Sequence, residues 1–200
     1  MKKILILFAH PKFEKSRANL ALIDRIKGID GITFHDLYEK YPNFHIDVPV
    51  EQALLAHHDV IIWHHPFYWY SCPPLMKQWI DMVLEFNWAY GPKGSALHSK
   101  TCLNVITTGG SLEVYCSEGY NSFTVAQFLR PFEQTARLCG MVYYPPFAVM
   151  GTHNLNDEKL TEYANNYGKL IELLKTDLSV EDSEGCSFLN DIPQLKQVAS

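Results

Sequence analysis

A basic loop without glycine joins an apolar strand to an amphipathic helix between Leu7 and Leu22. Ser16 stands where the helix should begin, and Arg17 follows it. A helix N-terminus offers unpaired N–H groups and about half a positive charge, so it favours a phosphate group. Walker and Rossmann loops need glycines to approach phosphates closely, which disfavours ATP and a Rossmann-bound dinucleotide here. The plainer alternative is a capped helix after a surface loop.

Four consecutive aromatic residues form a second stretch, within the sequence HPFYWYSCPPL. Phe67, Tyr68, Trp69 and Tyr70 follow an apolar run. Exposing all four at the end of a strand is costly unless an aromatic ligand or a partner subunit covers them. The alternative is an aromatic cluster inside the core.

A glycine pair ends the third stretch, TTGGS, which contains Thr107, Thr108, Gly109 and Gly110. Glycine lets backbone N–H groups come close to the edge of a ligand. Such donors at the pyrimidine edge of a flavin would stabilise the negative charge that builds there on reduction. The alternative is a loose turn. Tyr115, a few residues later, either closes the pocket or lies at the surface.

These stretches can form one site only if the fold brings them together. Apolar runs such as KKILILFA and DVIIWHHP are typical of strands buried on both faces, and helical segments alternate with them. This order predicts an α/β fold, a flavodoxin-like three-layer sandwich with a five-stranded parallel sheet in the order 2-1-3-4-5. The three loops should then converge at the carboxyl edge of the sheet. Strands are predicted at 2–9, 31–38, 59–66, 100–110 and 141–151, and helices at 17–27, 50–59, 73–85, 122–139 and 155–176.

Composition indicates one globular domain. The chain has 200 residues, of which 47% are hydrophobic, enough for a large core without cross-links. We expect a flavin-binding domain over residues 1–177 and a C-terminal tail over 178–200, either mobile or packed on a partner. A net charge of -5 without a basic run disfavours nucleic acid. No apolar run approaches the roughly 20 residues that span a bilayer.

The cysteines and histidines do not indicate a metal site. The five cysteines are scattered and form no C-x-x-C motif, which favours reduced thiols in the cytoplasm. The pairs His57-His58 and His64-His65 point in divergent directions on a helix or strand, so neither pair can hold one ion. We therefore expect no structural metal.

Taken together, the three loops describe one ligand. A phosphate at the first, a planar ring at the second and amide donors at the third match flavin mononucleotide (FMN). Each signal alone is weak, and their shared place at the predicted edge of the sheet strengthens them.

Several segments, in the same order, resemble a known family. They are AHP with S-x-A-N, LYEKYPNFHID, HPFYWYSCPPLMKQWID, WAYG, ALHSK, TTGG and CG with PPFA, between about Lys3 and Lys175. In these segments the chain resembles the flavodoxin-like NAD(P)H dehydrogenase (quinone) family. Within it, the chain is most similar to the ancillary quinone reductases of glutathione-regulated potassium-efflux systems.

The resemblance implies roles for individual residues. Two departures from the family pattern are Tyr68, where many relatives have glutamine, and Asn121, where some have histidine. Asn121 can donate a hydrogen bond but cannot supply a proton at neutral pH. The implied cofactor-binding residues are His10, Ser16, Arg17, Ala18, Asn19, Phe67, Tyr68, Trp69, Tyr70, Thr107, Thr108, Gly109, Gly110 and Tyr115. The catalytic candidates are Tyr115, Gly109, Gly110 and Asn121, and the candidates for a substrate pocket are Trp69 and Tyr90.

The activity that the resemblance implies is flavin-dependent NAD(P)H:quinone oxidoreduction, a two-electron hydride transfer by a ping-pong mechanism. We expect FMN as cofactor because no element for the adenosine half of FAD is recognised, although FAD remains an option. No residue pattern selects NADH or NADPH, or one acceptor among quinones and other electrophiles. The alternatives are a one-electron flavodoxin-type carrier and a regulatory ancillary subunit of a potassium-efflux antiporter. Family members are homodimers, and an antiporter partner would place the protein at the inner face of the cell membrane.

Overall fold

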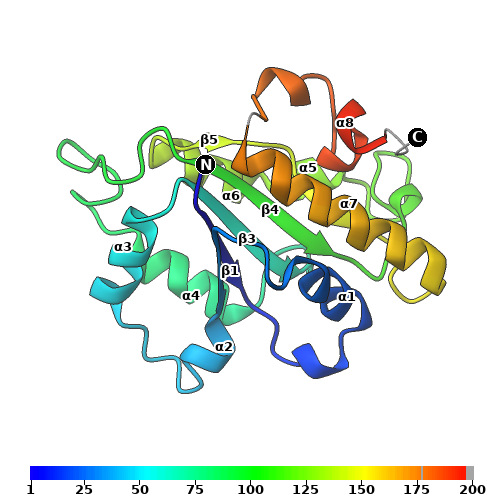
Figure 1. Cartoon of the computed structure of the whole chain (residues 1–200), viewed down its shortest axis with the longest axis horizontal. Helices are drawn as coiled ribbons and strands as arrows, with labels where there is room; N and C mark the ends of the chain where they lie inside the picture. The colour runs from blue at the N-terminus through cyan, green and yellow to red at the C-terminus, as the bar shows by residue number, and fades with distance from the viewer. Residues whose placement is uncertain (177, 197–200) are drawn as a thin grey trace.

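A parallel sheet forms the centre of the fold. The computed structural model describes residues 1–176 and 178–196. Its strands lie in the order β2-β1-β3-β4-β5, of which β1, β3, β4 and β5 are labelled in Figure 1. β6 also pairs with β4. The predicted flavodoxin-like order 2-1-3-4-5 is therefore confirmed. The strands are β1 (Ile4–Phe8), β2 (Ile32–Asp36), β3 (Val60–Pro66), β4 (Thr101–Thr107), β5 (Val142–Tyr143) and β6 (Phe147–Val149).

The fifth predicted strand is divided into two pieces. β5 ends at Tyr143 and β6 begins at Phe147, with Pro145 and Pro146 between them. Proline has no N–H to donate to a sheet ladder, so the pairing with β4 stops at the prolines and resumes after them. The carboxyl end of β6 still reaches the end of β4, because Val149 is paired with Thr107.

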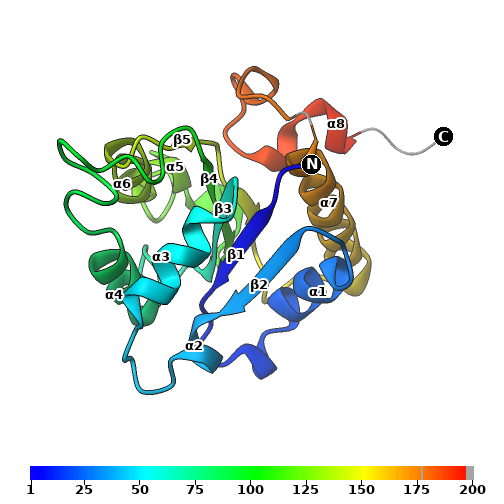
Figure 2. The same cartoon turned by 60° about the vertical axis from the view of Figure 1, so that its left-hand side comes forward.

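Helices cover both faces of the sheet. Figure 2 shows α1 and α7 on one side and α3, α4, α5 and α6 on the other. The central strands β1, β3 and β4 are buried along their whole length, which explains their continuous apolar sequences. The helices of four or more residues are α1 (Arg17–Ile26), α2 (Leu37–Lys40), α3 (Val48–Ala56), α4 (Pro74–Val83), α5 (Val125–Phe128), α6 (Arg130–Leu138), α7 (Asp157–Lys175) and α8 (Pro193–Lys196).

The helix predicted over residues 122–139 is also divided. Thr124 and Gln127 form a capping box that begins α5, and a second helix, α6, begins at Arg130. Pro131 lies in the first turn of α6. Proline lacks the N–H that would continue the ladder of α5 but is well suited to a helix start, so the break falls here.

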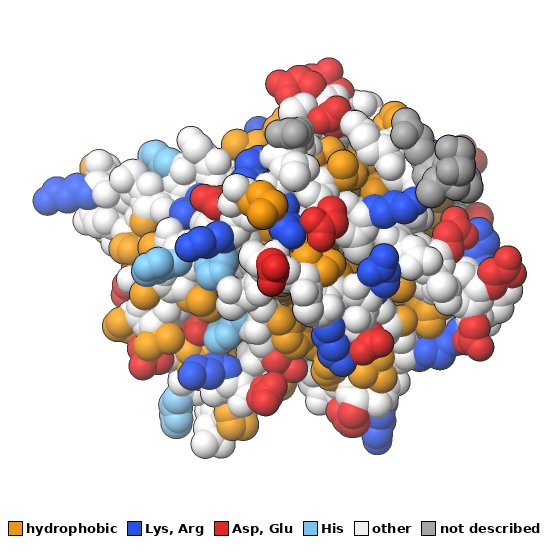
Figure 3. All heavy atoms as spheres, in the orientation of Figure 1, with side chains coloured by type: hydrophobic (Ala, Val, Ile, Leu, Met, Phe, Trp, Pro, Cys, Tyr) orange, Lys and Arg blue, Asp and Glu red, His pale blue; other side chains and the backbone are white. Residues whose placement is uncertain are grey.

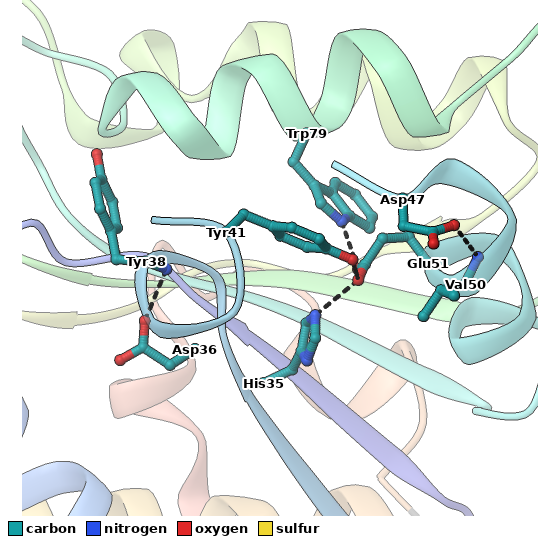
Figure 4. A network of polar contacts seen from close by, with 8 residues as sticks. All are labelled: His35, Asp36, Tyr38, Tyr41, Asp47, Val50, Glu51 and Trp79. Carbon is teal, nitrogen blue, oxygen red and sulfur yellow. Dashed lines mark hydrogen bonds and ion pairs between the residues drawn. The ribbon is translucent and has the colours of Figure 1, made fainter. Parts of the chain in front are cut away.

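A buried carboxylate holds together the elements that precede β3 and those that follow it. Glu51 of α3 is fully buried and accepts hydrogen bonds from Tyr41 Oη at 2.6 Å, Trp79 Nε1 at 2.7 Å and His35 Nε2 at 2.8 Å (Figure 4). Burial alone would raise the pKa of Glu51, but the three hydrogen bonds outweigh it and the net shift is downward. The carboxylate thus stays charged and joins β2, α3, α4 and the turn after α2.

The segment after residue 177, expected to be mobile or packed on a partner, packs on its own domain as far as residue 196. Leu178, Leu189, Ile192 and Leu195 are buried in the same core cluster as α1 and α7. Asn190 clamps β6 with two side-chain hydrogen bonds, accepting from the N–H of Ala148 at 2.8 Å and donating to its carbonyl oxygen at 3.1 Å. The segment forms two short 3-10 helices, η3 (Glu181–Ser183) and η4 (Leu189–Asp191), before α8.

The surface carries charges of both signs. Figure 3 shows acidic and basic side chains interspersed over the face that carries α1 and α7. None of the helices within residues 1–176 and 178–196 combines the length and the apolar character needed to cross a bilayer. Within the same residues, no three His, Cys, Asp or Glu side chains converge as a metal site would require.

Candidate functional site

The first loop places a capped helix N-terminus next to the end of β1. Ser16 is the N-cap of α1, and its Oγ accepts from the N–H of Asn19 at 3.4 Å and from Asn19 Nδ2 at 2.8 Å. The backbone amides of Arg17 and Ala18 lie in the first turn, where a helix has no acceptor for them. This geometry suits an anion at the helix start.

His10 provides a neutral donor beside this helix start. The backbone N–H of Lys12 donates to His10 Nδ1 at 3.1 Å, so the imidazole proton lies on Nε2. Burial lowers the pKa of His10, and the nearby carboxylate of Glu14 only partly opposes that shift. His10 is therefore uncharged at neutral pH and has an N–H to offer. Its ring lies 6.0 Å from the ring of Tyr68, which joins the first loop to the second.

Arg17 does not turn toward the loop. Its Nη2 donates to the carbonyl oxygen of Leu155 at 2.5 Å and to Asp157 Oδ1 at 3.1 Å, at the start of α7. Both partners of this ion pair are largely exposed, so its contribution to stability is small. In this arrangement Arg17 contributes its backbone amide to the helix start, and its guanidinium links α1 to the start of α7.

The second loop presents its aromatic residues on a strained turn. The N–H of Ser71 donates to the carbonyl oxygen of Tyr68 at 3.0 Å, which closes a four-residue turn. The two central residues, Trp69 and Tyr70, have φ angles of 49° and 64°, a region that non-glycine residues rarely adopt. The Trp69 side chain is 92% exposed, whereas Phe67 is buried. Strain of this kind persists at functional sites more often than elsewhere.

The third loop has no room for a side chain at either of its two glycines. A Cβ on Gly110 would lie 2.9 Å from Val114 Cγ2 and 3.0 Å from the Tyr115 ring, and one on Gly109 would lie 2.6 Å from His153 Nε2. Thr108 Oγ1 donates to the carbonyl oxygen of Gly110 at 2.5 Å and fixes the turn. Gly109 is exposed and Gly110 is half-buried, so the backbone of this loop can be reached from solvent.

Two hydrogen bonds bring all three loops together. Asn19 Nδ2 of the first loop donates to Thr107 Oγ1 of the third at 3.1 Å. The N–H of Phe67 in the second loop donates to the carbonyl oxygen of Thr107 at 2.9 Å. The predicted convergence at the carboxyl edge of the sheet is thus present in the structure.

The catalytic candidates Tyr115 and Asn121 lie beside the second loop. The ring of Tyr115 packs 5.8 Å from that of Phe67, and burial raises the pKa of its hydroxyl, which stays protonated at neutral pH. Asn121 Oδ1 accepts from Tyr70 Oη at 3.2 Å. Tyr90 lies apart from them, in the connection between α4 and β4, where its ring packs 5.6 Å from Phe86.

Three residues near the site were not predicted from the sequence. Phe128 of α5 stacks on Tyr70 at 4.8 Å, His153 lies over Gly109, and Nε2 of His64 in β3 lies 2.9 Å from Asn19 Oδ1. His153 could have been found, because the segment GTHN follows a strand that ends beside β4. The stacking of Phe128 on Tyr70 depends on the break between α5 and α6, and the hydrophobic periodicity of the sequence did not reveal that break.

Comparison with known proteins identifies the family. The model of a family described as having a flavodoxin-like fold matches residues 2–171. The chain belongs to this flavodoxin-like family. Its resemblance to the quinone-reductase members and to the potassium-efflux ancillary proteins is confirmed by the relatives below.

Three flavodoxin-like relatives show the range of names in the family. The potassium-efflux ancillary protein KefG of Salmonella paratyphi B is 43% identical over 169 residues, covering 84% of this chain and 92% of the relative. General stress protein 14 of Treponema denticola, solved in complex with FMN, has a TM-score of 0.82 at 38% identity, covering 86% of this chain and 99% of that one. A P. pentosaceus protein named NADPH-quinone reductase has a TM-score of 0.78 at 30% identity, covering 88% and 99%.

Proposed function

We propose that this protein is an FMN-dependent NAD(P)H:quinone oxidoreductase. The observation that carries the proposal is the junction of three loops at Thr107, which receives hydrogen bonds from Asn19 at 3.1 Å and from the backbone of Phe67 at 2.9 Å. The junction places a helix N-terminus, an aromatic turn and a glycine pair at one edge of the sheet, where open parallel sheets bind ligands.

The residues present fit FMN at both of its ends. Ser16, the amides of Arg17 and Ala18, and neutral His10 offer donors to a phosphate group. Gly109 is exposed and Gly110 is half-buried, so the backbone of the third loop is open to the edge of a flat ring, and neither position has room for a Cβ. The FMN complex of the Treponema relative supports the choice of cofactor.

Bound FMN would supply the hydride-transfer chemistry between NAD(P)H and a quinone. The backbone donors of Gly109 and Gly110 stabilise negative charge at the ring edge. Tyr115 holds a proton on its buried hydroxyl within reach of the third loop, since its ring packs against the position of a Gly110 Cβ. Asn121 contributes a hydrogen bond to Tyr70 rather than a proton.

A second copy of the chain completes the pocket in this proposal. Trp69 is 92% exposed on the strained turn and needs a covering surface to exclude water. Tyr90 lies in the connection between α4 and β4 and packs on Phe86, and in this proposal it lines the quinone pocket from the partner subunit of a homodimer. The expected location is the cytoplasm.

The decisive experiment is purification followed by a visible absorption spectrum and an assay of NADPH oxidation with menadione. We expect a yellow protein that releases FMN on denaturation and that oxidises NADPH only when the quinone is present. Released FAD would correct the cofactor alone. A colourless protein that takes up neither FMN nor FAD would contradict the proposal.

A second candidate function is regulation of a potassium-efflux antiporter, favoured by the 43% identity to a protein named as an ancillary subunit. Enzyme activity and regulation can coexist in one protein. A variant that binds FMN but no longer oxidises NADPH would separate them when expressed with the antiporter encoded nearest its gene. Normal potassium efflux with that variant would support a regulatory role independent of turnover, and loss of efflux would tie regulation to the reaction.

A further inference from the structure

A chain of buried neutral groups connects α7 to the first and third loops. Tyr167 Oη lies 3.4 Å from His64 Nδ1, and His64 Nε2 lies 2.9 Å from Asn19 Oδ1. Asn19 Nδ2 then reaches Ser16 Oγ at 2.8 Å and Thr107 Oγ1 at 3.1 Å. Tyr167, His64 and Asn19 are completely buried. The hydrogen-bonded series therefore ends at two hydroxyl groups, one at the N-cap of α1 and one at the end of β4.

This series of hydrogen bonds can have its hydrogen atoms in two arrangements. In one, Tyr167 donates to His64 Nδ1, His64 Nε2–H donates to Asn19 Oδ1, and the Asn19 amide donates to both hydroxyl oxygens. In the other, every bond runs in the opposite direction, and the hydroxyls of Ser16 and Thr107 donate to Asn19. Only the first arrangement leaves both hydroxyl hydrogens free to point away from Asn19.

The Tyr167 hydroxyl selects the first arrangement. Burial, with a smaller contribution from His65 and His10, lowers the pKa of His64 to about 3, so its ring carries one proton at neutral pH. In the part of the chain that the structure describes, His64 Nδ1 is the one acceptor within hydrogen-bond distance of Tyr167 Oη. If Nδ1 carried the proton, the Tyr167 hydroxyl hydrogen would be buried without an acceptor, which is costly.

We propose that His64, oriented by Tyr167, is a positioning residue that directs the hydroxyl hydrogens of Ser16 and Thr107 toward a bound phosphate monoester. Phosphate oxygens only accept hydrogen bonds when ionised, so a site made entirely of donors matches them, and charge-assisted bonds to an anion are the stronger kind. This inference rests on the proposed FMN function and assigns the discrimination between FMN and riboflavin to residues behind the candidate phosphate site.

A second buried histidine provides a matched control. Tyr143 Oη donates to Asn104 Oδ1 at 2.6 Å, Asn104 Nδ2 lies 3.0 Å from His65 Nε2, and His65 Nδ1 donates to the carbonyl oxygen of Pro66 at 3.0 Å. This second series of hydrogen bonds joins the same kinds of groups, but it ends at a backbone carbonyl. Tyr143→Phe therefore removes a buried hydroxyl without touching Ser16 or Thr107.

The test is the ratio of the dissociation constants of riboflavin and FMN, measured by fluorescence quenching on flavin-stripped protein. We expect Tyr167→Phe and His64→Leu to weaken FMN by about tenfold or more while riboflavin changes less than about twofold. His64→Gln, whose amide can still donate to Asn19, should restore most of the ratio, and Tyr143→Phe should leave it unchanged. A merely structural role would weaken both ligands equally.

A second measurement needs no flavin. Inorganic phosphate should raise the melting temperature of the flavin-stripped wild type and of Tyr143→Phe, but not that of Tyr167→Phe. The inference would be overturned if Tyr167→Phe and His64→Leu both kept the wild-type ratio of dissociation constants and the wild-type response to phosphate. The proposed function would then still stand. A wild type that binds neither flavin would overturn the proposed function and this inference with it.

Discussion

Two networks of buried polar groups lie on opposite faces of the sheet, and they differ in charge and in where they end. On the side of α3 and α4, Glu51 is a charged group with three donors from the chain itself (Figure 4). On the side of α1 and α7, the network of His64 is neutral and ends at the hydroxyls of Ser16 and Thr107. A closed charged network holds a scaffold together, whereas an open neutral network leaves donors available for a ligand.

The largest expected effect is on the closed network. Glu51→Ala should lower the free energy of unfolding by about 3–5 kcal/mol, because it leaves the donors of His35, Tyr41 and Trp79 buried without a charged acceptor. Urea denaturation measures this loss. Glu51→Gln, which keeps the volume and one acceptor oxygen, should lose less.

Glu51 should have no effect on the discrimination between FMN and riboflavin. The ratio of riboflavin to FMN dissociation constants should be the same in Glu51→Gln and in the wild type. A change of stability below about 1 kcal/mol in Glu51→Ala would show that the closed network is not a scaffold.

The second effect is a difference in pH dependence. Unfolded histidine takes up a proton near pH 6.5, whereas burial lowers the pKa of folded His64 to about 3. Between these values the unfolded chain binds one more proton, so His64 makes the free energy of unfolding fall by about 1.4 kcal/mol for each pH unit of acidification. His64→Gln should remove this slope from about pH 6 to about pH 4, as measured by denaturation at several pH values.

The two networks should respond in different pH windows. The pKa of folded Glu51 is lowered, so its charge contributes stability above the unfolded pKa near 4.5, and that contribution is lost as the pH falls through the folded value. Glu51→Gln should therefore differ from the wild type in slope only below about pH 4.5, whereas His64→Gln should already differ near pH 6. Equal slopes for wild type and His64→Gln would mean that His64 is protonated in the folded state.

The third effect concerns ligand binding alone. Gly110→Val should weaken FMN by about tenfold or more, because its side chain would collide with Val114 and Tyr115 at the third loop. Gly109→Ala should be milder, since its close neighbour is the end of the exposed His153 side chain, which can move away. Equilibrium dialysis against FMN measures both. Full flavin content in Gly110→Val would argue that the third loop does not contact the ring.

The fold could be predicted from the sequence because its signals are local. The runs that became β1, β3 and β4 are apolar throughout, as strands covered on both faces must be. Their alternation with helices limits the topology to a few choices, and the convergence of the three loops follows from that topology. The predicted helix and the predicted strand that the structure divides are both broken at prolines, Pro131 and the pair Pro145-Pro146, where an N–H is missing. The strand predicted over residues 31–38 is too long, because β2 ends at Asp36 and α2 begins at Leu37.

The site was harder to predict because its details depend on residues far apart in the chain. Arg17 looked like a ligand for phosphate, but its partners Leu155 and Asp157 are about 140 residues away. The network that begins at Tyr167 was invisible for the same reason. The tail was judged by its polar composition, yet a few buried leucines and the side-chain clamp of Asn190 are enough to hold it on β6.

The smallest effect concerns the strain of the aromatic turn in the second loop. Trp69 has a positive φ of 49° and a side chain that is 92% exposed, so its replacement removes strain and almost no packing. Trp69→Asn, a residue that tolerates this backbone region, should raise the free energy of unfolding by about 1 kcal/mol and also raise the KM for quinone. Ser99→Asn is the matched control, because Ser99 has a φ of 63° in the turn before β4. It should gain similar stability with unchanged kinetics. If Trp69→Asn gained stability and kept wild-type kinetics, Trp69 would have no part in the quinone pocket.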